Sequence, residues 1–421
     1  MQHVEHAAPC AGRDRGGAKA MKILVCPHHM GMGGSQLNAI ELAGKVRDLG
    51  HEVVIYAPDG VLVSMVRDLG IPYAEAPETG NTKQWRLELN RLIDEHGIDV
   101  VHAYEWGPSL AASFSAGIRN STPVVASVMS MQVPEFLPRH LPIIVGTPAL
   151  ASELAWQQRT AFLLEPPVDV QANTTGDAAA ARRQLGIADG EMVVSVVSML
   201  STELEKLQGI LSAIALVDRL AEEHPVRLLI AGDGDGMDQV RERARAVNEA
   251  HGRTAVDALG YLEDPRPAYA AADIVLGMGT SAIKGMAHAK ALIVQGEAGY
   301  WKTLTEENAE HFLSEGWFGY EGRGVADLEA ALLALFSDPD LRVRLGAFGR
   351  ALVESRYSLE RSANELTKIY FDLLAHRGST SAGTRARSLL RSAFEVSRFR
   401  AAMKSGAPTD REKWSHSGVT L

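Results

Sequence analysis

Strand-like and helix-like segments alternate along most of the chain, and the alternation occurs in two series. The first begins with the apolar run KILVCP at 22–27, which precedes LNAIELAGKVRDLG, a segment with apolar residues at helical spacing. The second begins with MVVSVVSML at 192–200, after a polar, small-residue stretch at 171–191. Repeated β–α units build parallel sheets with buried strands. The sequence therefore predicts two doubly wound, Rossmann-like α/β domains with a ligand cleft between them.

The alternation divides the chain into five parts. We expect a disordered leader, an N-terminal domain, a C-terminal domain, a further helix and a basic tail, at 1–20, 21–168, 169–355, 356–375 and 376–421 respectively. The leader lacks the apolar core of a secretory signal. The tail segment 385–404 is basic, with large apolar residues in an approximate helical stripe, which suits either a membrane surface or an ordinary docked helix.

Composition excludes several classes of protein. The net charge of −10 argues against nucleic-acid binding through bulk electrostatics. The chain has 2 cysteines, too few for a disulfide framework or a cysteine-rich metal site. No run of about 18 or more apolar residues is present to cross a membrane. A cytosolic location is expected, and the oligomeric state stays open.

Glycine-rich loops follow several predicted strands, at the edge where such sheets bind ligands. In the first loop, Gly33, Gly34 and Ser35 open a helix, so backbone N–H groups could meet a phosphate or sugar; a plain tight turn is the alternative. In AGDGDG, Gly232 and Gly234 alternate with aspartates. These letters resemble a metal-binding DxD, but a glycine turn with aspartates at a helix start explains them without a metal.

A third loop, GMGTSAIKG at 277–285, places a lysine near the start of a helix. Thr280 or Ser281 is expected to cap that helix. Lys284 then lies near its positive end, where a cation costs about 0.3–1 kcal/mol. The helix either tolerates the lysine or has a negative group in front of it. With its glycines and hydroxyls, the loop has the parts of an anion pocket.

Other polar residues also follow predicted strands. Lys206 lies after the first strand of the second series, where it could reach a phosphate or remain a solvated surface lysine. Glu105 follows IDVVHAY and is a candidate for contacting a hydroxylated substrate. His102, within the same motif, could be catalytic, although a core histidine with satisfied ring nitrogens is the favoured alternative.

The order of these segments resembles glycosyltransferase family 4, a large group of retaining, nucleotide-sugar-dependent enzymes with the GT-B fold. The resemblance covers about residues 21–375. It rests on the first glycine loop with its helix, IDVVHAY, LLEPPVDV, LLIAGDGDG, the run at 258–296 and RYSLERSANELTKIY. It implies an N-terminal acceptor domain, a C-terminal nucleotide-sugar domain, and a last helix that packs back on the first domain.

The resemblance also implies roles for the loops. The first glycine loop would approach the donor diphosphate, Lys206 would bind its phosphates, backbone at 260–261 would meet the base, and 279–281 would lie beside the sugar. The implied reaction is retaining: a donor phosphate oxygen assists deprotonation of a hydroxyl acceptor, without a metal or other cofactor. The candidate donor-binding residues are Gly33, Gly34, Ser35, Lys206, Gly232, Gly234, Gly260, Tyr261, Gly277, Gly279, Thr280, Ser281, Lys284 and Glu297. The candidate catalytic residues are His102, Glu105, Lys206 and Lys284.

The chain departs from the family pattern within this set. Met199 stands where an arginine partners the lysine, Met129 where a histidine is common, and Lys284 where a carboxylate usually meets the ribose. Glu297, after the strand ALIVQG, could restore a carboxylate near the sugar or simply cap a helix. One interpretation is that Lys284 has taken over phosphate neutralisation from the missing arginine. The other is that the donor site has decayed and the protein is a non-catalytic binding partner.

The expected partners are a nucleotide sugar and a hydroxylated acceptor, which could be a glycan, a lipid-linked molecule or a small molecule. Peripheral contact with the inner face of a membrane through 385–404 is a further expectation. A nicotinamide-dependent oxidoreductase is disfavoured, because no GxGxxG precedes an acidic residue at the next strand end.

Overall fold

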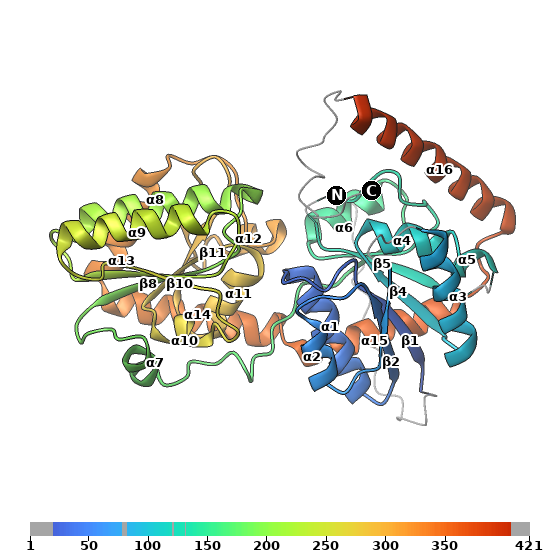
Figure 1. The fold of residues 1–421 in the computed structure, drawn as a ribbon, viewed down its shortest axis with the longest axis horizontal. Helices are drawn as coiled ribbons and strands as arrows, with labels where there is room; N and C mark the ends of the chain where they lie inside the picture. The colour runs from blue at the N-terminus through green and yellow to red at the C-terminus, as the bar shows by residue number, and fades with distance from the viewer. Residues whose placement is uncertain (1–19, 78–81, 120–121, 131, 406–421) are drawn as a thin grey trace, which may run out of the picture.

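The computed structural model describes residues 20–77, 82–119, 122–130 and 132–405. Nearly all of the leader expected at 1–20, and the end of the tail from 406 onward, lie outside these residues. The described chain forms two sheets covered by helices, which Figure 1 shows as two separate lobes.

The N-terminal sheet has seven parallel strands in the order β3-β2-β1-β4-β5-β6-β7. Its strands are β1 (Lys22–Cys26), β2 (Glu52–Ala57), β3 (Tyr73–Glu75), β4 (Val100–Tyr104), β5 (Val124–Val128), β6 (Ile143–Val145) and β7 (Ala161–Leu163). The central strands β1, β4 and β5 are almost wholly buried, which is why they appear in the sequence as continuous apolar runs.

Helices cover both faces of this sheet. They are α1 (Gly34–Asp48), α2 (Val63–Asp68), α3 (Lys83–His96), α4 (Trp106–Ser113), α5 (Ala116–Arg119) and α6 (Pro148–Trp156), joined by α15 (Leu359–Ala375) and α16 (Ala382–Ser405) from the end of the chain. One apolar cluster holds α1, α2 and α15 on one face, and a second holds α3, α4, α6 and α16 on the other. None of the helices within the described ranges is long and apolar enough to cross a bilayer.

The C-terminal sheet repeats the same winding in the order β10-β9-β8-β11-β12-β13. Its strands are β8 (Met192–Val197), β9 (Val226–Ala231), β10 (Val256–Gly260), β11 (Ile274–Gly277), β12 (Ala291–Gln295) and β13 (Trp301–Thr303). Its helices are α7 (Ala178–Gln184), η1 (Glu203–Glu205, a 3₁₀ turn), α8 (Lys206–Leu220), α9 (Met237–His251), α10 (Arg266–Ala271), α11 (Gly279–Ala287), α12 (Ala309–Glu315), α13 (Val325–Ser337) and α14 (Pro339–Arg356). The edge strand β13 is antiparallel and too short to show a period in the sequence.

The prediction of two doubly wound domains is confirmed. In each sheet the winding direction reverses beside the first strand, between β1 and β4 and between β8 and β11. Ligands bind at such switch points, outside the carboxyl ends of the strands. The loops after these four strands carry many of the candidate residues, and the others lie at the ends of β9, β10 and β12.

The chain passes between the domains twice, and the two crossings pair with each other. Val168 N–H donates to Tyr357 O at 2.8 Å, and Leu359 N–H donates to Val168 O at 3.2 Å. An ion pair between Glu165 and Arg356, with a shortest N···O distance of 2.6 Å, reinforces the joint. After the second crossing, α15 packs against α1 on the N-terminal sheet.

The β9–α9 loop passes so close to the β8–α8 loop that it requires glycine. A Cβ on Gly232 would lie 1.8 Å from Ser198 O, and Gly232 also has a φ of +145°.

Gly232→Ala is expected to destabilise the protein by more than about 3 kcal/mol in urea unfolding, because the backbone of one of the two loops must move. Gly252→Ala is the control: its φ is +61° but nothing lies within 4 Å of the added methyl. Equal losses for the two variants would contradict the steric account.

Candidate donor site between the two domains

The first glycine loop places the start of α1 opposite the C-terminal domain. Gly33 precedes the helix, and a Cβ there would lie 2.3 Å from Gln36 Oε1, so the Gln36 carboxamide fills that space. Gln36 Nε2 is 3.0 Å from His28 Nε2 and 2.8 Å from His29 Nε2, which ties the loop together. A Cβ on Gly34 would lie 3.8 Å from Thr280 Oγ1 of the other domain. The starts of α1 and α11 therefore lie close to each other where the two domains face.

The start of α11 differs from the sequence prediction. The helix begins at Gly279 and is capped by Met278, so the expectation that Thr280 or Ser281 is the N-cap is wrong. A contact with a distant segment explains the difference. Gly279 N–H donates to Trp317 O at 2.9 Å, and this hydrogen bond fixes the start of the helix at Gly279. Ser281 Oγ instead reaches back, accepting from Met278 N–H at 3.3 Å. A Cβ on Gly277 would lie 2.9 Å from that hydroxyl oxygen.

Lys284 lies one turn further along α11, half-buried, and faces a carboxylate of the other domain. Burial raises the pKa of the Glu41 carboxyl on α1, and the nearby charge of Lys284 counteracts that rise. The negative charge of Asp169 raises the pKa of Glu41 further. No carboxylate of the described chain lies within ion-pair distance of the Lys284 ammonium. Because α11 ends at Ala287, Lys284 lies in its last turn, where the helix dipole favours a cation, so the expectation that it lies near the positive end is wrong. Glu41 is a nearby carboxylate that is not within ion-pair distance.

Lys206 opens α8 in the loop after β8. Its Nζ lies 3.1 Å from Glu203 Oε2, and the two side chains are only 18% and 27% exposed. The residues between them, Leu204 and Glu205, have left-handed φ values of 51° and 52°, a conformation that side chains other than glycine rarely adopt. Met199 is 42% exposed at the position where the family pattern has an arginine. The phosphate-binding candidate is thus already paired with a carboxylate of its own loop.

Glu297 lies in the turn that follows β12, and the Lys206 loop holds this turn. Glu205 Oε2 accepts a hydrogen bond from Ala298 N–H at 2.9 Å. Glu297 N–H donates to Gly319 O at 3.0 Å. Burial raises the pKa of the Tyr320 phenol, and the Glu297 charge adds to that shift. The structure therefore places Glu297 beside Tyr320, in a turn tied to the loop that bears Lys206.

The glycines of AGDGDG have a packing role. A Cβ on Gly234 would lie 2.8 Å from Leu200 O, and Gly232 N–H donates to Gly260 O at 2.8 Å. Asp233 Oδ1 accepts from Gly234 N–H, as expected for an aspartate that orders a turn. Within the described ranges, no group of three histidine, cysteine or acidic side chains is placed to hold a metal. Tyr261, just beyond Gly260, is 53% exposed.

Glu105 is buried and joins three loops of the N-terminal domain. It is 3% exposed, with a φ of 60° at the start of α4. Its carboxylate accepts hydrogen bonds from Ser35 Oγ (3.0 Å), Met129 N–H (3.1 Å) and Ser130 Oγ (2.9 Å). Burial raises its pKa, these hydrogen bonds oppose the rise, and the charge of Glu203 adds to it from across the cleft. The side chain predicted to contact substrate thus contacts protein donors that order the glycine loop.

His102 lies in the core beneath these loops. Its Nδ1 is 2.7 Å from Tyr370 Oη of α15, and its Nε2 is 2.8 Å from Ser127 Oγ. Complete burial lowers the pKa of the imidazole to about 3. His102 is therefore a buried core histidine with both ring nitrogens hydrogen-bonded, which is the alternative that the sequence favoured.

Sequence reasoning missed two carboxylates of the site. Glu203 carries a local signal, because it stands three residues before Lys206 in TELEK, where the loop folds it back on the lysine. Glu41 carries none: its charged neighbours, Lys284 and Asp169, both come from distant segments of the chain.

Both halves of the chain match family models. Residues 32–164 match the model described as Glycosyltransferase Family 4, and residues 191–338 match Glycosyl transferases group 1. This chain belongs to the GT-B glycosyltransferases of family 4. The alpha-monoglucosyldiacylglycerol synthase of Streptococcus pneumoniae is 30% identical over 165 residues, which are 38% of this chain and 35% of that relative. The chain thus matches about a third of that relative's length.

Solved structures share the fold at low identity. A glycosyltransferase from Rickettsia africae superposes with a TM-score of 0.69 at 16% identity, covering 85% of this chain and 99% of the other. HepE from Anabaena, in complex with UDP, superposes with a TM-score of 0.66 at 19% identity, covering 84% of this chain and 100% of the other. These similarities place the family 4 chain described here in the GT-B fold.

The raised pKa of Glu105 makes a prediction about stability. A raised folded-state pKa means that the native protein binds the proton more tightly, so stability falls as the pH rises through and above the ordinary glutamate range. Glu105→Gln keeps an acceptor and removes the buried charge. The free energy of unfolding of the variant, measured in urea titrations, is expected to exceed that of the natural protein by a margin that grows from about pH 4 to pH 7. The ordinary pKa of a glutamate carboxyl roughly sets the lower end of this range. Glu135→Gln, at an exposed glutamate, is the control. Parallel curves for Glu105→Gln and the natural protein would contradict the burial effect.

Proposed function

We propose that this protein transfers a sugar from a nucleoside-diphosphate sugar to a hydroxyl acceptor with retention of anomeric configuration. The observation that carries the proposal is the meeting of two helix starts from different domains, with Gly34 and Thr280 in near contact. A helix start favours an anion; at α1 the first N–H groups face the other domain, whereas at α11 the Gly279 N–H already donates to Trp317 O. The solved HepE structures contain UDP and UDP-glucose, which supports a diphosphate at the equivalent edge of this GT-B fold.

The proposed donor site uses residues of both domains. The diphosphate lies between the starts of α1 and α11, with Lys206 exchanging Glu203 for a phosphate oxygen. The exposed ring of Tyr261, beside Gly260, meets the base. Neutralisation by helix starts and lysines requires no metal in this proposal. In the proposed retaining step, a donor phosphate oxygen takes the acceptor proton on the face that the leaving group vacates.

The acceptor side of the proposal concerns the N-terminal domain and α16. The printed name of the Streptococcus relative describes a synthase of a glucosylated diacylglycerol. In this chain α16 carries six basic residues against one glutamate, and it exposes Leu390 (72%) and Phe394 (63%). Basic and apolar groups on one helix favour a membrane surface. We therefore propose a hydroxyl acceptor presented at the inner face of a membrane, with α16 in peripheral contact.

The donor assignment predicts stabilisation by nucleotides. UDP or another nucleoside diphosphate at about 100 times its Kd is expected to stabilise the fold by about 2.7 kcal/mol, seen as a rise in Tm. Lys206→Ala is expected to weaken that binding by about tenfold to a hundredfold, because it removes a charge-assisted hydrogen bond of about 1.5–3 kcal/mol. Lys368→Ala, on the exposed side of α15, is the control.

If no nucleoside diphosphate or nucleotide sugar raises the Tm, the enzyme assignment fails and the decayed binding partner is favoured. Where turnover is found with a nucleotide sugar, the anomeric configuration of the product by NMR decides between retention and inversion.

The Glu41–Lys284 pair makes a second prediction. Lys284→Glu is expected to weaken nucleoside-diphosphate binding by tenfold or more, since it replaces an attractive charge with a repulsive one, roughly 1.4 kcal/mol per tenfold. Glu41→Gln is expected to strengthen it, because the lysine loses its competing carboxylate. Calorimetric titration with UDP measures both. Unchanged affinity in the two variants would mean that Lys284 serves only the domain contact.

A further inference from the structure

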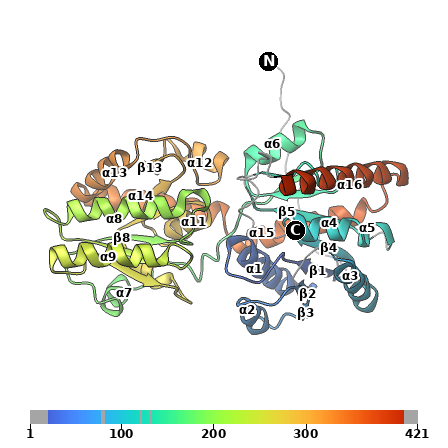
Figure 2. The same ribbon diagram turned by 45° about the horizontal axis from the view of Figure 1, so that its top comes forward.

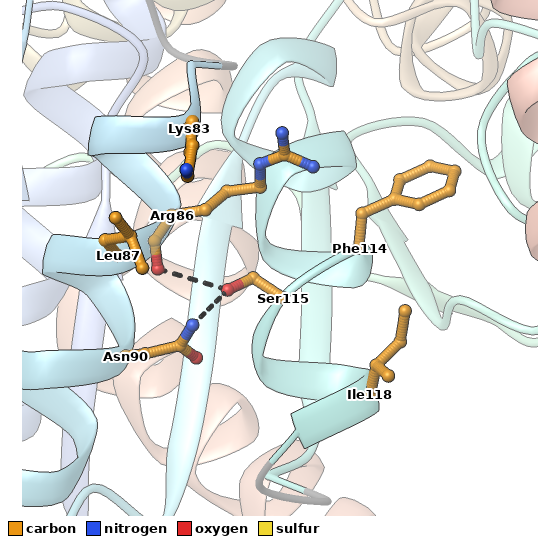
Figure 3. Close-up of a pocket in the computed structure, with 7 residues that line it drawn as sticks. All are labelled: Lys83, Arg86, Leu87, Asn90, Phe114, Ser115 and Ile118. Carbon is orange, nitrogen blue, oxygen red and sulfur yellow. Dashed lines mark hydrogen bonds between the residues drawn. The ribbon is translucent and has the colours of Figure 1, made fainter.

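We infer that a hollow on the N-terminal domain, between α3 and α5, binds the phosphate head group of a hydroxylated glycerophospholipid. The inference rests on the proposed membrane contact and names the lipid chemistry for it. The hollow is lined by four residues of α3 and three of the α4–α5 segment, drawn in Figure 3: Lys83, Arg86, Leu87, Asn90, Phe114, Ser115 and Ile118.

The floor of the hollow contains an amide with an unused polar atom. Asn90 is 7% exposed, and its Nδ2 donates to Ser115 Oγ at 2.7 Å. Ser115 Oγ in turn donates to Arg86 O at 3.2 Å. Asn90 Oδ1 is buried and has no hydrogen-bond partner in the described chain. An acceptor left in this way calls for a donor such as a hydroxyl.

The rim above the amide is positively charged. Lys83 is the first residue of α3, which Thr82 caps by accepting from Trp85 N–H at 3.1 Å. Arg86 lies one turn further on, and its guanidinium extends across the hollow in Figure 3. No carboxylate of the described residues lies within ion-pair distance of either cation. Two unpaired cations at a helix start favour an anion, and the amide beneath them favours one that carries a hydroxyl.

The edges of the hollow suit a lipid better than a free ion. Leu87 is 57% exposed and Ile118 is 55% exposed, so apolar side chains flank the cations. The hollow also lies on the face of the sheet that α16 covers, because Phe114 and the α16 residues Val396 and Phe399 pack against the same apolar cluster. Figure 2 shows α16 passing beside α4 and α5. Cations, exposed apolar groups and a basic helix on one face are the combination that an anionic bilayer attracts.

The test is co-sedimentation of the full chain with vesicles of phosphatidylcholine, with or without phosphatidylglycerol. Each cation near an anionic surface contributes about fivefold to partitioning, so Lys83→Ala/Arg86→Ala is expected to lower binding about thirtyfold. Arg243→Ala/Arg245→Ala removes the same charge from the exposed side of α9 and is expected to change binding less than about twofold. Equal losses for the two double variants would overturn the site.

Asn90→Leu tests the hydroxyl. Phosphatidylglycerol and phosphatidylmethanol carry the same charge, but only the first has head-group hydroxyls. The natural protein is expected to prefer phosphatidylglycerol, and the variant to bind both equally. An unchanged preference would overturn the role of the amide. Release from vesicles by millimolar glycerol phosphate, as strongly as by added lipid, would identify a free phosphate ester and overturn the lipid assignment.

Two further measurements separate this inference from the proposed function. Vesicle binding by Leu390→Ser/Phe394→Ser tests membrane contact through α16 alone. The rise in Tm that UDP causes in every variant tests the donor site. Loss of vesicle binding in the α16 variant, with none in the hollow variants, would retain the proposed membrane contact and reject the hollow. Loss in the hollow variants, with UDP stabilisation intact, would support the inference independently of the donor site.

Discussion

The two chain crossings hold the domains together, and the geometry of the candidate site depends on them. Val168 pairs with the backbone around Ser358, and Glu165 pairs with Arg356, so both crossings form one joint. The joint sets the loops of two separate sheets opposite each other. The approach of Gly34 to Thr280, and the electrostatic pairs between the domains, depend on that placement, to which the packing of α6 against α12 also contributes.

Each candidate phosphate-binding lysine already faces a carboxylate of the protein. Lys206 is in contact with Glu203 on its own loop, and Lys284 faces Glu41 on the other domain. Under the proposed function, a diphosphate would exchange partners within one loop at Lys206. At Lys284 it would compete with the charge of a carboxylate from the other domain.

The sequence predicted the features that local patterns encode, namely the two β–α series, the glycine loops at strand ends and the place of Lys206 after the first strand of the second series. It missed those that depend on distant segments. Ser281 does not cap α11 because Trp317, far along the chain, fixes the turn earlier. The burial of Glu105 was not foreseen, because its three hydrogen-bond donors come from other loops of the same domain. Glu41 becomes a site residue only when the domains dock, and no periodicity within α1 records that event.

The glycines distinguish a rewired donor site from a decayed one. Gly232 cannot be replaced without a backbone clash, so its presence follows from packing and carries no information about ligands. Gly34 differs: it has an ordinary negative φ, and an added Cβ would meet only Thr280 Oγ1 at 3.8 Å. Neither packing nor backbone conformation requires glycine here, whereas close approach of a ligand to the start of α1 does. Together with Lys284 on the facing helix α11, this favours a donor site whose charges have been rearranged while its anion-binding backbone has been kept.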